Sequence, residues 1–259
     1  MHSYDFTISQ LLLRIQSPCK LIIPENFQPF LTNSAENRNP EIRLEIQSNP
    51  DLGKQKYVEF IEPKKKAGRG EPCRLFLQPK LFDSFCQTGC WLNCFPLERM
   101  LLPWGRMILH ASAVIYQGEV YVFAAPSGTG KSTHAALWEK YFGGEILNGD
   151  KVILHKEGDR VMASGGPVAG SSEIYRNETY PVAALFLLKQ APENRVTPVS
   201  KRTAVLSLYS HAVKSEQDGE FNNQLVDLAV SLEERLNIFS LECTPEKAAV
   251  ECILKKRKG

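Results

Sequence analysis

The chain has 259 residues, of which 43% are hydrophobic and 23% charged. A chain of this length forms one large or two small domains, and this composition excludes a wholly disordered, collagenous or coiled-coil protein. The formal net charge of +2 is too close to zero to indicate a nucleic-acid partner. No apolar run approaches the roughly 20 residues of a membrane helix, and the start lacks a signal-peptide pattern, so we expect a cytoplasmic protein without a membrane partner.

The seven cysteines are expected to be reduced thiols, because an odd number in a chain without a signal peptide argues against a disulfide framework. Cys86, Cys90 and Cys94 recur every four residues, which would place them on one face of a helix. This step does not match the C-x₂-C spacing of metal-binding knuckles. We therefore favour three buried thiols over a metal or iron–sulfur site.

Residues 1–104 are predicted to be a β-rich region, which could be independent or packed on the rest of the chain. Residues 64–70, KKKAGRG, are interpreted as a solvated basic loop, with an anion site as the alternative. Residues 80–104 have a helical pattern that Pro96 and Pro103 interrupt. Short apolar stretches, several of them alternating as strands do, lie at residues 8–15, 19–24, 41–47, 57–62 and 73–78.

Residues 105–259 are predicted to form an α/β core. Two tight turns, at Gln117-Gly118 and near Glu157-Gly158, indicate hairpins on both sides of a glycine-containing loop. Ordinary nucleotide-binding folds with such a loop are parallel βαβ repeats, so the hairpins favour a mixed, hairpin-rich sheet with flanking helices. Further expected elements are a helix after the loop, a buried strand at 181–189, helices at 201–214 and 221–236, a strand at 237–243, and a last helix capped by Thr244.

Residues 125–132, APSGTGKS, match the phosphate-binding loop (Walker A) motif with Ala125 in place of the first glycine. Backbone N–H groups of such a loop and the following helix N-terminus bind phosphate oxygens. Lys131 would supply a solvent-reachable cation to the β- and γ-phosphates, and Ser132 a hydroxyl to Mg²⁺. The motif follows an apolar strand and precedes a helix, which makes a chance match improbable. The residues expected to bind the nucleotide are Ser127, Gly128, Thr129, Gly130, Lys131, Ser132 and Thr133.

Asp150 and His110 are the candidate catalytic residues nearest to this loop. Asp150 follows the next apolar stretch, nineteen residues after Lys131, where an acid could hold Mg²⁺ or accept a proton from a hydroxyl. The alternative for Asp150 is a plain Asn-Gly-Asp turn. The hairpin would fold His110 back beside the loop, where it could orient the nucleophile or pair with Asp150, and the alternative is a core histidine.

Arg176 is a third catalytic candidate, because it could neutralise charge on the transferring phosphoryl group. Its alternative is a surface salt bridge. It follows a run of small residues at 165–172, GGPVAGSS, which would let the backbone approach a substrate or be a plain connection. His134, just after the loop, is expected to be structural or to face solvent.

The segment from Leu109 to Lys189 resembles the catalytic core of the HPr kinase/phosphorylase-like proteins, whose fold is shared with phosphoenolpyruvate carboxykinases. The resemblance rests on a histidine some twenty residues before the loop lysine, the SGTGKS loop, and the acid after the next strand. It implies that Lys131 and Ser132 hold phosphate and Mg²⁺, that Asp150 is the base or a metal-linked acid, and that His110 assists. Those relatives transfer phosphate from ATP to a protein serine.

The family's kinases often carry two adjacent acids, and Gly149 stands where the first would be. The expected function is an ATP- and Mg²⁺-dependent phosphotransferase acting on a hydroxyl of a protein, peptide or small molecule. The alternative is a nucleotide-binding regulatory module without turnover, and a carboxykinase-type lyase is a third hypothesis. The sequence leaves open the acceptor and whether copies of the chain associate.

Overall fold

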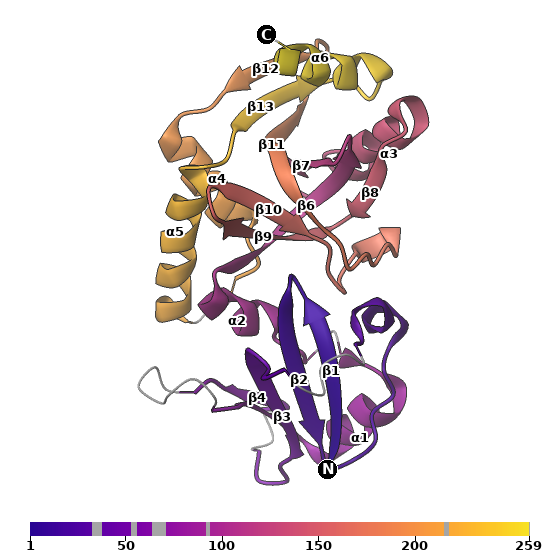
Figure 1. Cartoon of the computed structure of the whole chain (residues 1–259), viewed down its shortest axis with the longest axis vertical. Helices are drawn as coiled ribbons and strands as arrows, with labels where there is room; N and C mark the ends of the chain where they lie inside the picture. The colour runs from indigo at the N-terminus through magenta and orange to yellow at the C-terminus, as the bar shows by residue number, and fades with distance from the viewer. Residues whose placement is uncertain (33–37, 53–55, 64–70, 92–93, 215–217, 259) are drawn as a thin grey trace. The chain divides into compact units, whose positions relative to one another are not determined.

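The structure, a computed structural model, divides the chain into two compact units, residues 1–100 and 101–259 (Figure 1). It describes residues 1–32, 38–52, 56–63, 71–91, 94–214 and 218–258. The predicted basic loop at 64–70 lies outside these residues. Among the described residues, no helix combines the length and the apolar character that crossing a membrane requires.

The first unit is built on a five-stranded mixed sheet with the order β1-β2-β3-β5-β4. Inward-facing apolar residues alternate with polar ones along its strands, as Leu44 and Ile46 do in β3, which is why these short segments become strands. Residues 19–24, one of the short apolar stretches, lie outside the strands. The strands are β1 (His2–Ile8), β2 (Leu11–Ser17), β3 (Ile42–Ser48), β4 (Val58–Ile61) and β5 (Cys73–Leu77), and a 3₁₀ turn, η1 (Glu25–Phe30), follows β2.

The helical segment of the first unit does not align the cysteines. Helix α1 (Pro79–Thr88) ends at Gly89, whose φ of +67° reverses the chain, so Cys90 and Cys94 lie beyond the helix. The predicted shared face is therefore wrong. Burial raises the pKa of Cys86 to about 11 and that of Cys94 to about 12, which keeps both thiols protonated. No group of three or more metal-ligating side chains occurs among the described residues.

The second unit contains an eight-stranded mixed sheet, as the hairpin pattern predicts. Strands β7 and β13 are parallel to β11, whereas β6 is antiparallel to β7, β8 and β9. Because β10 pairs with both β9 and β11, the strands β10, β9, β6, β7 and β11 close a ring of pairings. The strands are β6 (Arg106–Tyr116), β7 (Glu119–Ala124), β8 (Glu145–Asn148), β9 (Lys151–Glu157), β10 (Arg160–Ser164), β11 (Thr179–Gln190), β12 (Arg195–Pro198) and β13 (Ile238–Cys243).

Two separate apolar cores hold the helices of this unit to the sheet. Trp138 from α3 and Val250 from α6 belong to one core, and Leu208 from α4 and Leu225 from α5 belong to the other. Two short helices, α2 (Leu97–Leu101) and η3 (Leu102–Trp104), precede the sheet. The helices packed on it are α3 (Lys131–Phe142), α4 (Lys201–His211), α5 (Gly219–Glu233) and α6 (Lys247–Lys258).

Thr244 does not cap the last helix as predicted. Helix α6 begins at Lys247. The Thr244 N–H donates instead to Asn194 Oδ1 at 2.9 Å, and Asn194 Nδ2 donates to the Thr244 hydroxyl at 3.2 Å. This pairing joins the segment before β12 to the end of β13.

Candidate functional site

Strand β6 brings the phosphate-binding motif and Asp150 to the same edge of the sheet. On one side of β6, Ala111 pairs with Ala124, the last residue of β7, so His110 stands opposite the start of the loop. On the other side, His110 pairs with Lys151, the first residue of β9. The Ala111 N–H donates to the Asp150 carbonyl at 2.8 Å. The hairpin of β6 and β7 therefore places His110 beside the loop, as predicted.

The motif forms a turn between β7 and α3, in which the Thr129 N–H donates to the Pro126 carbonyl at 3.3 Å. Gly128 and Gly130 have φ of +77° and +105°, values that strongly favour glycine. Gly130 is the N-terminal boundary residue of α3, and no described side chain caps this helix. The first backbone N–H groups of an uncapped helix have no intrahelical acceptor and attract anions. This arrangement fits the predicted binding of phosphate oxygens.

Lys131 is more buried than predicted. Its exposed fraction is 8%, and its ammonium donates to the carbonyls of Ala125 at 2.8 Å and Pro126 at 3.3 Å. Burial lowers the pKa of Lys131, and the nearby Asp150 carboxylate opposes that shift. The ammonium therefore closes the loop on itself, and a phosphate would have to compete with these two carbonyls for it.

Asp150 and His110 form a pair beside the loop. His110 Nδ1 lies 3.2 Å from Asp150 Oδ1, and both side chains are partly exposed, His110 at 37% and Asp150 at 25%. Burial lowers the pKa of His110 most, Asp150 opposes this, and the charge of Lys131 lowers the pKa further. The imidazole is therefore neutral at pH 7. A neutral imidazole has one N–H donor and one acceptor nitrogen, and Nδ1 is the nitrogen that faces the carboxylate.

The fully buried Asn148 holds Asp150 in place, a role that the sequence analysis did not assign. Its Oδ1 accepts from the N–H groups of Asp150 at 2.9 Å and Lys151 at 2.7 Å. Its Nδ2 donates to the carbonyls of Val168 at 2.9 Å and Gly166 at 3.3 Å. An Asn at the end of a strand before Gly-Asp is a known turn signal, but the partners of Nδ2 are about twenty residues away and were not foreseeable.

The loop after β10 occupies the space beside Gly149. A Cβ atom on Gly149 would lie 2.4 Å from Ser172 Oγ and 2.5 Å from Ser172 Cβ. Ser172 is itself fixed by donating to the Ala169 carbonyl at 2.6 Å. A side chain at position 149 therefore requires this loop to move, so the chain is built for a single acid, Asp150, at this turn.

Arg176 is engaged in ion pairs instead of belonging to this site. Its Nη1 lies 2.7 Å from Glu145 Oε2 and 3.7 Å from Glu178 Oε1. Glu145 is the first residue of β8, at the opposite end of that strand from the turn that holds Asp150. The salt bridge that was the alternative interpretation of Arg176 is present.

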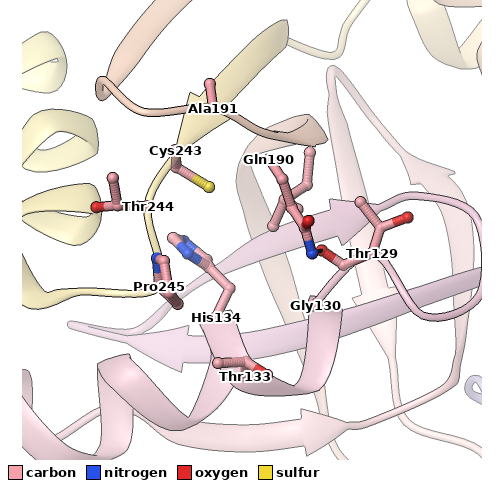
Figure 2. A pocket seen from close by; sticks show the side chains of 10 residues that line it. Thr129, Gly130, Thr133, His134, Gln190, Ala191, Cys243, Thr244 and Pro245 are labelled. Atoms are coloured by element: carbon pink, nitrogen blue, oxygen red, sulfur yellow. Dashed lines mark hydrogen bonds between the residues drawn. The ribbon is translucent and has the colours of Figure 1, made fainter.

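A cavity of about 450 Å³ adjoins the loop and the first turn of α3 (Figure 2). His134 projects into it, although the sequence predicted only a structural or solvent-facing residue. The cavity was not foreseeable, because residues more than one hundred positions apart form its wall. They are Thr129, Gly130, Thr133, His134, Leu188, Gln190, Ala191, Cys243, Thr244 and Pro245.

The chain matches no known family profile and no curated protein sequence. In fold it is similar to the Hpr(Ser) kinase/phosphatase from Coxiella burnetii, a structure with 12% sequence identity. The match covers 59% of this chain and 99% of that chain, with a TM-score of 0.34.

Proposed function

We propose that the chain is an ATP- and Mg²⁺-dependent phosphotransferase that acts on a hydroxyl group. The observation that carries the proposal is the register of β6, which brings the uncapped loop, Lys131 and the Asp150–His110 pair to one edge of the sheet. A phosphate loop alone indicates nucleotide binding. A carboxylate with a neutral histidine beside that loop adds a group that can take a proton.

The loop would bind the β- and γ-phosphates through its backbone N–H groups. Gly128 and the start of α3 supply donors without a side chain in the way, and Ser127 and Gly128 are exposed. The Lys131 ammonium has three donors, of which two contact loop carbonyls. A γ-phosphate oxygen, which is charged, is a stronger acceptor for it than a carbonyl.

The donor set fits Mg²⁺ held together with a nucleotide. Mg²⁺ is usually bound by one or two carboxylates, water and substrate phosphates, not by a cage of protein ligands. Here the exposed Ser132 hydroxyl and the Asp150 carboxylate are the two oxygen ligands expected, and no larger ligand cluster exists among the described residues. When bound, the metal would neutralise charge on the β- and γ-phosphates.

In the proposed reaction the acceptor hydroxyl oxygen forms a bond to the γ-phosphorus while the bond to the β–γ bridging oxygen breaks, and ADP leaves. Asp150 takes the hydroxyl proton on Oδ2, since Oδ1 faces His110. His110 donates from Nδ1 to Oδ1 and holds the carboxylate in position. Asn148 fixes the backbone of the same turn through the Asp150 N–H. In phosphoryl transfer most of the rate enhancement comes from positioning the reacting groups and stabilising charge. A base held beside the loop fits this requirement.

A nucleotide-binding regulatory module without turnover is the second candidate. It is favoured by the missing acid at Gly149, whose place Ser172 fills, and by the contacts of the Lys131 ammonium with the loop carbonyls. In that case the protein would bind ATP and respond to it without consuming it.

The test is single-turnover transfer from γ-labelled ATP with Mg²⁺ to a panel of acceptors. The panel comprises randomised Ser-, Thr- and Tyr-containing peptides, free serine and glycerol. A labelled phosphate ester that forms on one acceptor supports the phosphotransferase. Tight ATP binding without ester formation on any acceptor favours the regulatory module, and absence of ATP binding overturns both candidates.

A further inference from the structure

The imidazole of His134 is buried and has no hydrogen-bond partner among the described residues. Buried polar groups of folded proteins usually have such a partner. The exposed fraction of His134 is 3%, and neither Nδ1 nor Nε2 has a partner among the described residues. The ring packs edge-on against Phe123, with 4.4 Å between ring centroids. A buried polar group without a hydrogen-bond partner destabilises the fold. The two ring nitrogens of His134 therefore need an explanation.

His134 belongs to the wall of the cavity beside the loop. Figure 2 shows its ring projecting from α3 toward Cys243, with Pro245 on one side and Gln190 and Thr129 on the other. His134 lies three residues after Lys131, on the same first turn of the helix. The cavity therefore begins where the proposed phosphate site ends.

The lining of the cavity fits a neutral ligand. None of its ten residues is Asp, Glu, Lys or Arg, so an ionic group would find no partner on this wall. Apolar atoms come from Leu188, Ala191 and Pro245, and polar atoms come from the threonine hydroxyls and Gln190. The Gln190 amide nitrogen donates to the Thr129 carbonyl at 3.2 Å, which ties this wall to the loop. An apolar cavity of this size with a few polar groups is typical of a small-molecule site.

We propose that this cavity holds the base of the bound nucleotide and that His134 recognises the base by hydrogen bonding. The inference rests on the proposed function, because the phosphates on the loop anchor the ligand. A neutral imidazole offers one N–H donor and one acceptor nitrogen, and the edge of a purine base offers both kinds of partner. Binding the base would then give a partner to one of the two nitrogens, neither of which bonds to another described residue.

His134→Leu tests this role because leucine keeps an apolar group of similar bulk and removes both nitrogens. We expect the dissociation constant of ATP to rise about tenfold, the size of losing one or two neutral hydrogen bonds. The dissociation constant of tripolyphosphate, which lacks a base, should stay within about twofold. His134→Gln should retain most of the ATP affinity, since its amide also donates and accepts. The melting temperature of His134→Leu should not fall, because neither nitrogen bonds to another described residue.

His155→Leu is the matched control. His155 is a second buried histidine of the same unit, 1% exposed, and it is not among the residues that line the cavity. Its replacement should leave the ATP affinity unchanged. Equal weakening of ATP and tripolyphosphate binding in His134→Leu, or a lower melting temperature, would mean that His134 acts only through the structure of the loop.

A probe without phosphate separates this inference from the function on which it rests. Millimolar adenosine should shift the imidazole ¹⁵N resonances of His134 in the wild-type protein. If ATP binds and depends on Lys131 while His134 is insensitive to both adenosine and mutation, the base lies elsewhere and the proposed function stands. If tripolyphosphate and ATP fail to bind but adenosine shifts the His134 resonances, the cavity is a nucleoside site. The assignment of the loop as a phosphate site is then wrong.

Discussion

Asp150 is the residue whose replacement should separate binding from chemistry. Asp150→Asn keeps the size of the side chain, but an amide takes up no proton at neutral pH and is a poorer ligand for a hard cation. We expect ATP still to bind and phosphate transfer to fall about 100-fold or more. The measurement is single-turnover transfer beside equilibrium ATP binding.

His110→Ala is the variant to compare with Asp150→Asn, because His110 lies beside the same carboxylate. Its proposed role is to hold the carboxylate, so His110→Ala should slow transfer less than Asp150→Asn does. The acceptor nitrogen Nε2 could itself receive the proton, since Nδ1 faces Asp150 at 3.2 Å. A larger loss in His110→Ala than in Asp150→Asn would therefore assign the base to His110.

At the scale of single residues, the sequence predicted positions that depend on local spacing. Lys131 and Gly130 follow from the motif, and Asp150 and His110 follow from the strands on either side. The partner of Arg176 could not be predicted, because Glu145 lies 31 positions away and the 2.7 Å ion pair between them has no local sequence signal. The surroundings of His134 could not be predicted either, since they come from β11 and the end of β13.

At the scale of elements, the loop at residues 169–172 and the turn at Gly149 form one packed unit. Gly149→Ala would push a methyl group against Ser172, and overpacking of this kind destabilises by about 1–3 kcal/mol. Ser172→Gly in the same chain removes both atoms that the methyl group would meet. The double variant should therefore be more stable than the sum of the two single effects, as measured by urea denaturation. Strictly additive effects would mean that the two positions do not share this space.

Elements with a strong local signal were predicted well, and those defined by long-range contacts were not. The helix from Lys131 and the hairpin between β6 and β7 are present at the predicted positions, because turn glycines bound them. Strand β12 was missed because its four residues are largely exposed and its pairing is with β13, about forty residues on. The predicted cap at Thr244 failed because Asn194, fifty positions away, binds that residue.

At the scale of the whole molecule, the second unit contains two buried histidines that should make its stability depend on pH. Burial lowers the pKa of His134 to about 4, and burial together with Arg106 lowers that of His155 to about 4. An unfolded histidine titrates near pH 6.5, so between these values the unfolded state binds more protons. The contribution of these two histidines to the free energy of unfolding should therefore be constant above about pH 7 and fall as the pH drops toward 4, by about 3 kcal/mol for each histidine.

Urea denaturation of the full chain between pH 7.5 and 4.5 measures this dependence. His134→Leu and His155→Leu should each reduce the slope between pH 6.5 and 4.5, while the contributions of other titrating groups remain. An unchanged slope in both variants would show that these histidines are charged or solvated in the folded protein.

The mixed sheet of the second unit was predictable as a class, because hairpins beside a phosphate loop exclude a simple parallel repeat. The closure of β10 onto β11 was not, since only three residue pairs join them and no turn marks the contact. The division after residue 100 lies four residues before the predicted boundary at residue 104. The loop, Asp150 and His110 meet at one edge of this sheet. The site therefore depends on strand pairings that the motif alone does not predict.

Calorimetric titration of ATP with Mg²⁺ into the wild-type protein and Lys131→Ala tests the central claim most directly. Lys140→Ala, on the same helix but outside the loop, is the control and should bind as the wild type does. Removing the Lys131 ammonium takes away charge-assisted hydrogen bonds to phosphate, so the dissociation constant should rise about 10- to 100-fold. A folded Lys131→Ala protein that binds ATP with the wild-type dissociation constant would contradict the assignment of this loop as the nucleotide site.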